Sequence, residues 1–390
     1  MDFESFFRGI FGLALLIAIA FLISNNKKKI NWKLVLSGFA LQIIFALLIL
    51  RGNSLRKFFD PLGWPKDFFN SVSYVFVFIL NFTTEGAKFV FGNLALAPGN
   101  DGNLGFFFAF QVLPTIIFFA SLMSVLYYLG VMQKIVQGMA WVMAKVMGTS
   151  GAESLSCTAN IFVGQTEAPL MIKPFIKGMT QSELLTIMIG GMATIAGGVM
   201  AAYIQMLGSA YAASHGIPLI EAQQIFATQL LGASVMAAPG AMMIGKILIP
   251  EVAESETKGT VKVAIEKNSS NIIEAAANGA GDGLQLALNV GAMLIAFIAF
   301  IALINFLLNG FGDLTGFNPY LISHFGQPLS FQLLIGLILQ FVAFGIGVPW
   351  QDSLTFGSLL GTKVVLNEFV AYSDLSPMIQ QGLLIYLDYQ

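Results

Sequence analysis

Long apolar stretches separated by short polar segments recur along most of the chain. Residues 6–24, 34–50, 104–131 and 286–308 form apolar runs that reach or approach the ~20 residues a helix needs to cross a hydrocarbon core of about 30 Å. Residues 228–249 form a further run of this kind. The pattern predicts an all-α integral membrane protein with several spans.

Other stretches are apolar on one face only or are interrupted by charges, as helices lying on a membrane surface are. Residues 71–90 are predicted to form an outer interfacial segment, and residues 133–147 an amphipathic helix on the inner surface. Residues 271–284 are predicted to form another interfacial helix, which follows a cytoplasmic loop at residues 251–270.

The first apolar run is followed at once by Lys27, Lys28 and Lys29. Because short lysine-rich loops mark the cytoplasmic side, the amino terminus is predicted to lie outside. The run has neither a basic leader nor a small-residue cleavage site, so we expect it to stay in the mature protein.

Residues 149–179 place carboxylate, hydroxyl and amide side chains among apolar ones, which is too polar and too broken for a helix that faces lipid. Irregular backbone persists at membrane depth only where protein or a cavity surrounds it. We therefore predict a re-entrant hairpin with its tip near Gly164. The next run, residues 184–207, holds glycine pairs at 190–191 and 197–198, which permit either close helix packing or an unwound stretch.

A second polar segment in apolar surroundings lies around Asn367, Glu368 and Phe369, after a predicted outer loop at residues 310–327. Each anomalous segment follows a Gly-Thr pair, at 148–149 or at 361–362. The topology brings the first segment in from the cytoplasm and the second from outside, which is the pattern of an inverted repeat. The predicted parts are scaffold spans with the outer segment (1–132), the inner interfacial helix, first hairpin and following transport-domain spans (133–250), the cytoplasmic loop, interfacial helix and scaffold span (251–309), and the outer loop with the second hairpin (310–390).

Composition supports a membrane protein, since 56% of the residues are hydrophobic and only 10% are charged, where a soluble domain has about 25%. A net charge of -2 offers no basic face for nucleic acid. A single cysteine, Cys157, excludes an intrachain disulfide framework. His215 and His324 both stand beside turn residues, so we expect no histidine-rich metal centre.

Two carboxylates, Glu167 and Glu368, fall in the polar segments of the two predicted hairpins. A carboxylate at the bilayer centre costs about 2.5 to 3.5 kcal/mol even on lenient insertion scales, so both are candidate functional groups. Gln165 and Thr166 both donate and accept hydrogen bonds, which suits recognition of a neutral polar solute.

Oxygen-bearing groups suited to a hard cation such as sodium lie nearby. The candidates are Asn160, the carbonyls around Val163, and Thr194 with Ile195 in the glycine-flanked run. A titrating Glu167 or Glu368 would instead support proton coupling, but the oxygen-rich set around Asn160 favours sodium.

Three runs of sequence are specific: NIFVGQTEAP at 160–169, ATIAGGV at 193–199 and NEFVAY at 367–372. Weaker matches lie at 112–115, 127–132 and 283–292. Over nearly the whole chain the sequence resembles the concentrative nucleoside transporter family, most closely its bacterial sodium-coupled members.

This resemblance implies that Gln165, Thr166 and Glu167 contact the nucleobase, with Val199 as an apolar neighbour, and that Glu368 binds the ribose hydroxyls. It implies a sodium site made of Asn160, the carbonyl of Val163, and Thr194 with the carbonyl of Ile195. It also implies a homotrimer in the bacterial inner membrane, without an organic cofactor, whose transport domain moves against a fixed scaffold.

The sequence departs from the family pattern in two places. Thr194 stands where the family has serine, which keeps the hydroxyl and adds a methyl group. The chain ends at Gln390, whereas family members continue into a broken helix with further ribose contacts and a final span. We therefore expect either a truncated form or an incomplete binding site.

The sequence as a whole predicts a secondary active transporter that imports nucleosides such as uridine by sodium symport. Proton-coupled nucleoside symport and a passive channel for small polar solutes are the alternatives. An intramembrane hydrolase would need an activated nucleophile beside a base. Ser154 and Ser156 lie near Glu153, but no histidine falls in the same layer, so we do not expect an enzyme.

Overall fold

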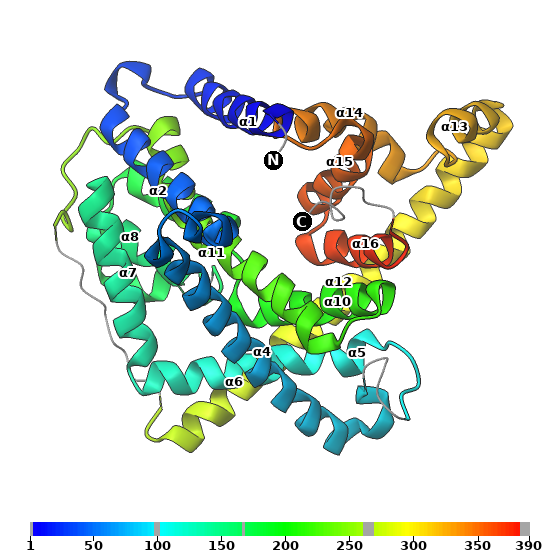
Figure 1. The fold of residues 1–390 in the computed structure, drawn as a ribbon, viewed down its shortest axis with the longest axis horizontal. Helices are drawn as coiled ribbons and strands as arrows, with labels where there is room; N and C mark the ends of the chain where they lie inside the picture. Colours follow the sequence, from blue (N-terminus) through cyan, green and yellow to red (C-terminus); the bar gives the residue numbers. More distant parts are fainter. Residues whose placement is uncertain (1–2, 97–101, 166–167, 260–268, 383–390) are drawn as a thin grey trace. The chain divides into compact units, whose positions relative to one another are not determined.

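The computed structural model describes residues 3–96, 102–165, 168–259 and 269–382 (Figure 1). Within these ranges the regular elements are helices, accompanied by an isolated β-bridge between Ser150 and Lys258. The all-α prediction is therefore confirmed. The chain divides into two compact units: a larger unit of Ala20–Gly208 and Pro218–Ala287, and a smaller unit of Met1–Ile19, Ser209–Ile217 and Leu288–Gln390.

The helices of the larger unit lie mainly between the second apolar run and the polar stretch after residue 250. In chain order they are η1 (Lys27–Lys29), α2 (Trp32–Leu50), α3 (Gly52–Arg56), η2 (Asp60–Gly63), α4 (Trp64–Phe91), η3 (Gly92–Ala95), α5 (Phe108–Gln111), α6 (Leu113–Tyr128), α7 (Val131–Met147), α8 (Gly151–Ala159), η4 (Ala168–Gly178), α9 (Gln181–Ala193) and α11 (Leu219–Leu248).

The smaller unit contains the other helices, three of which have residues in both units. These three are α1 (Phe3–Leu22), α10 (Gly197–His215) and α12 (Ile272–Leu314). The rest are α13 (Phe317–Phe325), α14 (Phe331–Gly345), α15 (Trp350–Val365) and α16 (Glu368–Gln380).

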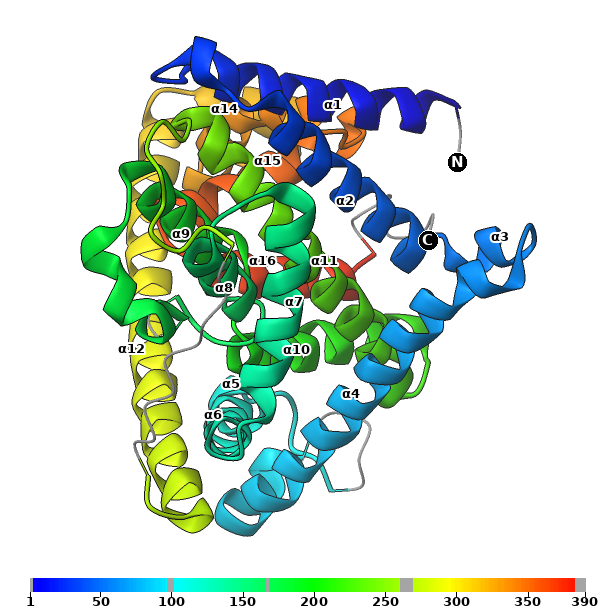
Figure 2. The ribbon, with the colours of Figure 1, turned by 90° about the vertical axis from the view of Figure 1, so that its left-hand side faces the viewer.

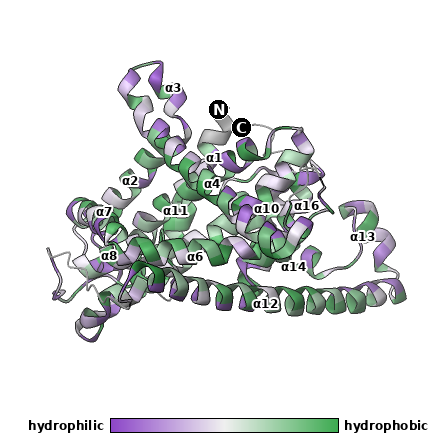
Figure 3. Cartoon of the chain, turned by 90° about the horizontal axis from the view of Figure 1, so that it is seen from below, coloured by the Kyte–Doolittle hydropathy of each residue, from purple (hydrophilic) through white to green (hydrophobic). Residues whose placement is uncertain are grey.

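Six helical segments among the described residues are long and apolar enough to cross a membrane, which confirms the prediction of several spans. They are Trp32–Ile49, Asp60–Ala95, Phe108–Tyr128, Gln181–His215, Leu219–Leu248 and Ile272–Leu314. Figure 3 shows that apolar residues dominate α12, the longest helix. Helix α4, which contains residues 71–90, is continuous and long enough to cross a membrane. The placement of residues 71–90 at the outer surface stays a prediction.

The interfacial helix predicted at residues 271–284 is not a separate element, because α12 runs on without interruption. Charges among the alanines and glycines of that stretch suggested an interfacial helix, but its glycines allow close packing. A Cβ atom at Gly283 would lie only 2.8 Å from the Cβ of Ala120 on α6. The predicted outer loop at 310–327 is likewise wrong in part, since it holds the end of α12 and all of α13.

The predicted span at residues 104–131 is interrupted near its start. Helix α5 ends at Gln111, and its buried side-chain amide donates to the carbonyl oxygens of Leu94, Leu96 and Gly105 at 3.1, 3.0 and 2.8 Å. Pro114 is then the second residue of α6, in the first turn, where its missing N–H removes no bond within the helix. The side-chain amide of Gln111 thus connects the break between α5 and α6 to the segment that precedes α5.

The core of the larger unit lies between α7, α8, η4 and α9. Small and medium apolar side chains from all four elements form one buried cluster: Met132, Val136, Ala140, Ala152, Leu155, Ala159, Ala168, Met171, Ile172 and Ile187. Figure 2 shows α7, α8 and α9 side by side. Beside them, 78% of the most apolar window of α11 is buried, against 17% for α12. Helix α11 is therefore the interior helix of this unit.

The smaller unit is built on two helices that pack unusually closely. Helices α14 and α15 meet at a bend of 118°, and glycines line their contact. A Cβ atom at Gly357 would lie 2.6 Å from the backbone nitrogen of Gln340 and 2.9 Å from the carbonyl oxygen of Gly336. Only a residue without a side chain fits there.

We therefore expect Gly357→Ala to destabilise the protein by about 1–3 kcal/mol, because backbone atoms cannot move aside as a flexible side chain would. The measurement is thermal unfolding of the purified protein in detergent. Gly310→Ala is the matched control, since a Cβ there meets no atom within 4 Å. Equal unfolding temperatures for the two variants would contradict the close packing.

Candidate functional site

The chain doubles back over residues 149–179, as the sequence predicts for the first hairpin. Helix α8 begins with a capping box, in which the Glu153 amide donates to the Ser150 hydroxyl at 3.3 Å and the Ser150 amide donates to the Glu153 carboxylate at 2.7 Å. The helix ends at Ala159, Asn160 follows it as the C-cap, and η4 forms the returning arm. Both arms pack in the same core as α7 and α9.

The run at residues 184–207, which holds the paired glycines, is divided between two helices, α9 and α10. Helix α9 ends at Ala193, the next residue Thr194 has an extended backbone, and α10 begins at Gly197. The Thr194 hydroxyl donates to the carbonyl oxygen of Gly190 at 2.9 Å, and the Ile195 amide donates to the buried Ser234 hydroxyl at 3.3 Å. Of the two alternatives for the paired glycines, the unwound stretch is therefore present.

The hairpin turn and this unwound stretch lie against each other. The Gly197 amide donates to the carbonyl oxygen of Phe162 at 3.0 Å. A Cβ atom at Gly190 would lie 2.7 Å from the sulfur of Cys157, and one at Gly197 would lie 2.8 Å from the Phe162 oxygen. The glycines thus serve close packing as well, and they bring the predicted set of Asn160, Val163, Thr194 and Ile195 into one region.

Asn160 is the most informative member of this set. Its side chain is 1% exposed, and neither atom of its amide has a hydrogen-bond partner among the described residues. A buried amide without a partner is costly, so its position requires an explanation such as a bound ligand. Helices α8 and α9 both end here, and their C-termini carry partial negative charge that favours a cation. The residues present therefore fit a hard cation.

The predicted substrate residues are placed only in part. Gln165 is exposed at the hairpin turn, and a Cβ atom at Gly191 would lie 2.9 Å from its Cβ atom. Val199 is half-buried in the first turn of α10. Thr166 and Glu167 lie outside the described residues.

Glu368 belongs to the smaller unit, where it is the first residue of α16 and is exposed. Asn367 caps this helix, and its side chain accepts a hydrogen bond from the Val370 amide at 3.0 Å. The Glu368 carboxylate therefore stands at a helix N-terminus, whose partial positive charge favours it.

The likeness between the two Gly-Thr pairs is not structural. Gly148 ends α7 in a left-handed conformation with φ of 73°, whereas Gly361 and Thr362 lie inside α15. The shared feature is instead the place of each glutamate along the chain. Glu167 directly precedes the returning arm η4, and Glu368 begins the returning arm α16.

Sequence reasoning missed a buried charge pair at the other end of α8. The Nζ atom of Lys246 lies 2.8 Å from the Oε2 atom of Glu153, and their side chains are 4% and 1% exposed. The signal was present, because Lys246 is the single charge in the apolar run at residues 228–249.

The serines considered as nucleophiles have other partners or none. Ser154 donates to the carbonyl oxygen of Ser150 at 2.7 Å and lies 2.7 Å from the Thr149 hydroxyl oxygen. Glu153 is paired with Lys246, and Ser156 has no hydrogen-bond partner among the described residues. No catalytic arrangement is assembled around these two serines in the part of the chain that the structure describes.

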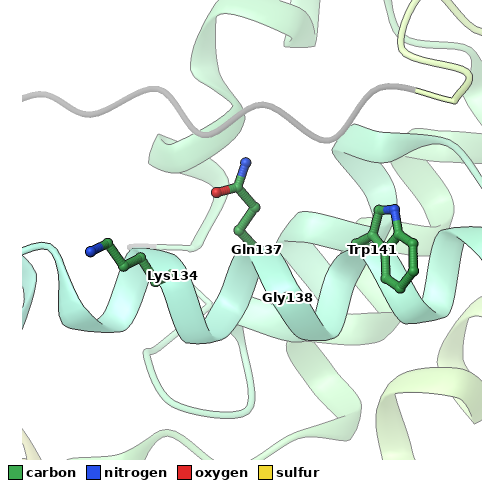
Figure 4. A pocket seen from close by; sticks show the side chains of 4 residues that line it. All are labelled: Lys134, Gln137, Gly138 and Trp141. Atoms are coloured by element: carbon green, nitrogen blue, oxygen red, sulfur yellow. The ribbon is translucent and has the colours of Figure 1, made fainter.

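A pocket lies on the exposed face of α7, away from the predicted site residues (Figure 4). Lys134, Gln137, Gly138 and Trp141 line it. The ammonium group of Lys145 lies 4.7 Å from the centre of the Trp141 ring. This face combines lysines with an indole, as amphipathic helices at a membrane surface commonly do.

We expect Gly197→Ala to loosen the contact between hairpin turn and unwound stretch, since its Cβ atom would meet the Phe162 carbonyl oxygen. The expected loss of stability is about 1–3 kcal/mol. Gly198→Ala is the control, because its Cβ atom would stay 3.8 Å from the nearest atom. Thermal unfolding of both variants checks this, and an unchanged Gly197→Ala protein would contradict it.

The apolar helices, the helical hairpin and the broken helix beside it define the class of multi-span membrane transporters. Three family profiles match the chain: the Na+ dependent nucleoside transporter N-terminus over residues 11–94, the nucleoside recognition (gate) domain over 109–210, and the Na+ dependent nucleoside transporter C-terminus over 229–386. The chain belongs to the concentrative nucleoside transporter family.

Relatives from bacteria and mammals agree with this assignment. The nucleoside permease NupC of Helicobacter pylori is 41% identical over 97% of this chain and 81% of its own length. The sodium/nucleoside cotransporter 1 of Mus musculus is 39% identical over 95% of this chain and 51% of its own length. The structure of CNTnw in an inward-facing substrate-bound state matches with a TM-score of 0.77 at 39% identity, over 95% of this chain and 79% of that one.

Proposed function

We propose that this protein imports nucleosides such as uridine by sodium symport. The observation that carries the proposal is the buried amide of Asn160, which has no hydrogen-bond partner among the described residues and lies where two helices end. An amide oxygen is a suitable ligand for a hard cation, and binding one would satisfy the unpaired Oδ1 atom. The name of the mouse relative, a sodium/nucleoside cotransporter, is in keeping with this.

In this proposal the ion is held by Asn160, the carbonyl of Val163, the hydroxyl of Thr194 and the carbonyl of Ile195. The nucleobase is bound by Gln165, Thr166 and Glu167, with Val199 as an apolar neighbour. Glu368 accepts hydrogen bonds from the ribose hydroxyls. The additional methyl group of Thr194 leaves its hydroxyl oxygen able to accept, since that hydroxyl donates to Gly190.

Coupling follows from the chain itself, because the ion ligand Asn160 and the base-contacting Gln165 belong to one short turn. An ion bound between residues 160–163 and 194–195 would hold the turn against the unwound stretch. The nucleoside would then bind a turn that is already ordered, which gives positive cooperativity between the two ligands.

The mechanical part of the proposal is a transport domain that moves against a fixed scaffold within a homotrimer. We place the protein in a bacterial inner membrane as a multi-pass protein with its amino terminus outside. No organic cofactor takes part in this mechanism, and we assign the chain no enzymatic activity.

Uptake of labelled uridine into proteoliposomes tests the proposal. We expect accumulation above the external concentration only when sodium is higher outside, and no accumulation when choline replaces sodium. A proton gradient without sodium is the second arm: accumulation there would assign proton coupling. Equilibration without accumulation under every gradient would assign a passive channel.

A further inference from the structure

A buried ion pair ties three elements together at the N-terminal ends of α8 and α9. Lys246, in the last turn of α11, places its Nζ atom 2.8 Å from the Glu153 carboxylate and 3.1 Å from the Ser182 hydroxyl. It also lies 2.9 Å from the carboxylate of Glu251, which is 28% exposed. One ammonium group thus contacts α8, α9 and the segment after α11.

That segment, residues 251–258, adds a second layer of contacts to α8. The Gly151 amide donates to the carbonyl oxygen of Thr257 at 3.0 Å, and the Ala152 amide donates to the Thr257 hydroxyl at 3.2 Å. Since the first amides of a helix have no partner within it, these bonds satisfy the start of α8. The segment is therefore fixed to the helix and is not an independent loop.

The same segment binds the start of α9. The Ser255 hydroxyl donates to the Glu183 carboxylate at 2.5 Å, and the Thr180 hydroxyl donates to Glu251 at 2.9 Å. Glu183 is also the capping-box residue of α9, as Glu153 is of α8. Glu153 and Glu183 stand at helix N-termini and Lys246 at a helix C-terminus, so the helix dipoles favour these three charges.

These contacts lie at the opposite ends of the two helices from the predicted ion ligands. Asn160 follows the last turn of α8, and Thr194 follows the last turn of α9. Glu153 and Asn160 are about 10 Å apart along the helix axis, so Lys246 does not itself touch the ion. A short, fully buried helix moves as a rigid rod, however, and a change at its start shifts its end.

We propose that Lys246 is a positioning residue for sodium: through Glu153 and Ser182 it fixes the register of α8 against α9. It thereby keeps the ligands at residues 160–163 opposite those at 194–195. Apolar side chains of similar volume would hold the elements together as firmly, whereas a charge pair with defined partners selects one register. This inference rests on the sodium coupling proposed above.

The experiment measures uridine uptake by the full chain across a sodium titration. Lys246→Met removes the charge and keeps an unbranched side chain that is one atom shorter. We expect its half-saturating sodium concentration to rise roughly 10-fold, the lower end of what loss of a residue that orients metal ligands costs. The half-saturating uridine concentration at saturating sodium is expected to stay within about twofold, since sodium then holds the ligands together. Lys246→Arg, which keeps the charge, is expected to restore most of the sodium affinity.

A neutral pair separates positioning from stability. In Glu153→Gln with Lys246→Met no buried charge is left unpaired, so thermal stability is expected to return towards that of the unaltered protein. Sodium affinity is expected to stay weak, because the register is no longer specified. Recovery of both quantities in the double variant would overturn the proposal in favour of a purely structural role.

Two further variants keep the test decisive. Glu251→Gln removes only the partly exposed partner of Lys246 and leaves the buried pair with Glu153 in place. If Lys246→Met does not fold, the sodium titration is made with Glu251→Gln instead. We expect this variant to lose about twofold in sodium affinity. Lys145→Met on the exposed face of α7 is the control, with no expected change. Sodium-independent uptake by the unaltered protein would reject the coupling itself, whereas sodium-dependent uptake with unaltered affinity in Lys246→Met and Glu251→Gln would reject this inference alone.

Discussion

An Asn160→Leu variant is expected to lose most of its sodium affinity while becoming more stable in the absence of sodium. Hydrogen bonds and ligand contacts to a charged partner contribute about 1.5–3 kcal/mol, which corresponds to a roughly 10- to 150-fold weaker affinity. Stability should rise because leucine has the branched shape and heavy-atom count of asparagine and removes an amide that has no partner among the described residues. A sodium titration of uridine uptake and thermal unfolding without sodium measure the two effects.

Ser156→Ala provides the comparison for this variant. Its hydroxyl is also buried without a described partner and lies one turn before Asn160 on α8, but it is not among the proposed ligands. We expect its sodium affinity to stay within about twofold, since no ligand is removed. If Ser156→Ala and Asn160→Leu weakened sodium binding equally, the assignment of Asn160 as a ligand would be lost.

A Glu368→Gln variant is expected to bind uridine at least about 100-fold more weakly, with little change in folding. A carboxylate that accepts from two ribose hydroxyls makes two charge-assisted hydrogen bonds, each of about 1.5–3 kcal/mol. Folding is spared because Glu368 is exposed and Asn367, not Glu368, caps α16. Equilibrium binding of labelled uridine to the purified protein gives the affinity.

Glu274→Gln, at a half-buried position in the first turn of α12, changes charge in the same way outside the proposed site. It should leave uridine affinity unaltered. A Glu368→Gln protein whose uridine affinity stayed within twofold of the unaltered protein would remove this residue from the proposed site. The sodium affinity of Glu368→Gln, measured beside it, is expected to change less than its uridine affinity.

Much of the fold could be predicted because a membrane span can be recognised in the sequence by its length and apolar composition. The first hairpin was equally visible, since a segment as polar as residues 149–179 has no stable place against lipid. The two possible roles of the paired glycines could not be separated in advance. Glycine suits both an unwound stretch and a close contact, and Gly197 turns out to serve both.

Errors arose where a local signal had more than one physical use. The charged residues of 271–284 indicated a separate interfacial helix, yet this stretch is the start of α12, and its glycines let that helix approach α6. The two Gly-Thr pairs are identical in sequence, but of the two glycines only Gly148 ends a helix. Contacts between distant segments, such as Lys246 with Glu153 and Ser234 with Ile195, depend on tertiary packing that no local pattern specifies.

The length of α12 constrains how its side chains are oriented along the helix. Its 43 residues extend for about 65 Å, while a helix tilted by 40° needs only about 26 residues to cross the hydrocarbon. The helix is therefore at least about 17 residues longer than a span tilted in this way needs. Gly279 and Gly283 pack against α6 and thereby fix the rotation of α12 about its own axis at that contact. One inserted residue further along would turn every later side chain by about 100° around the axis, so this helix can vary in its residues far more freely than in its length.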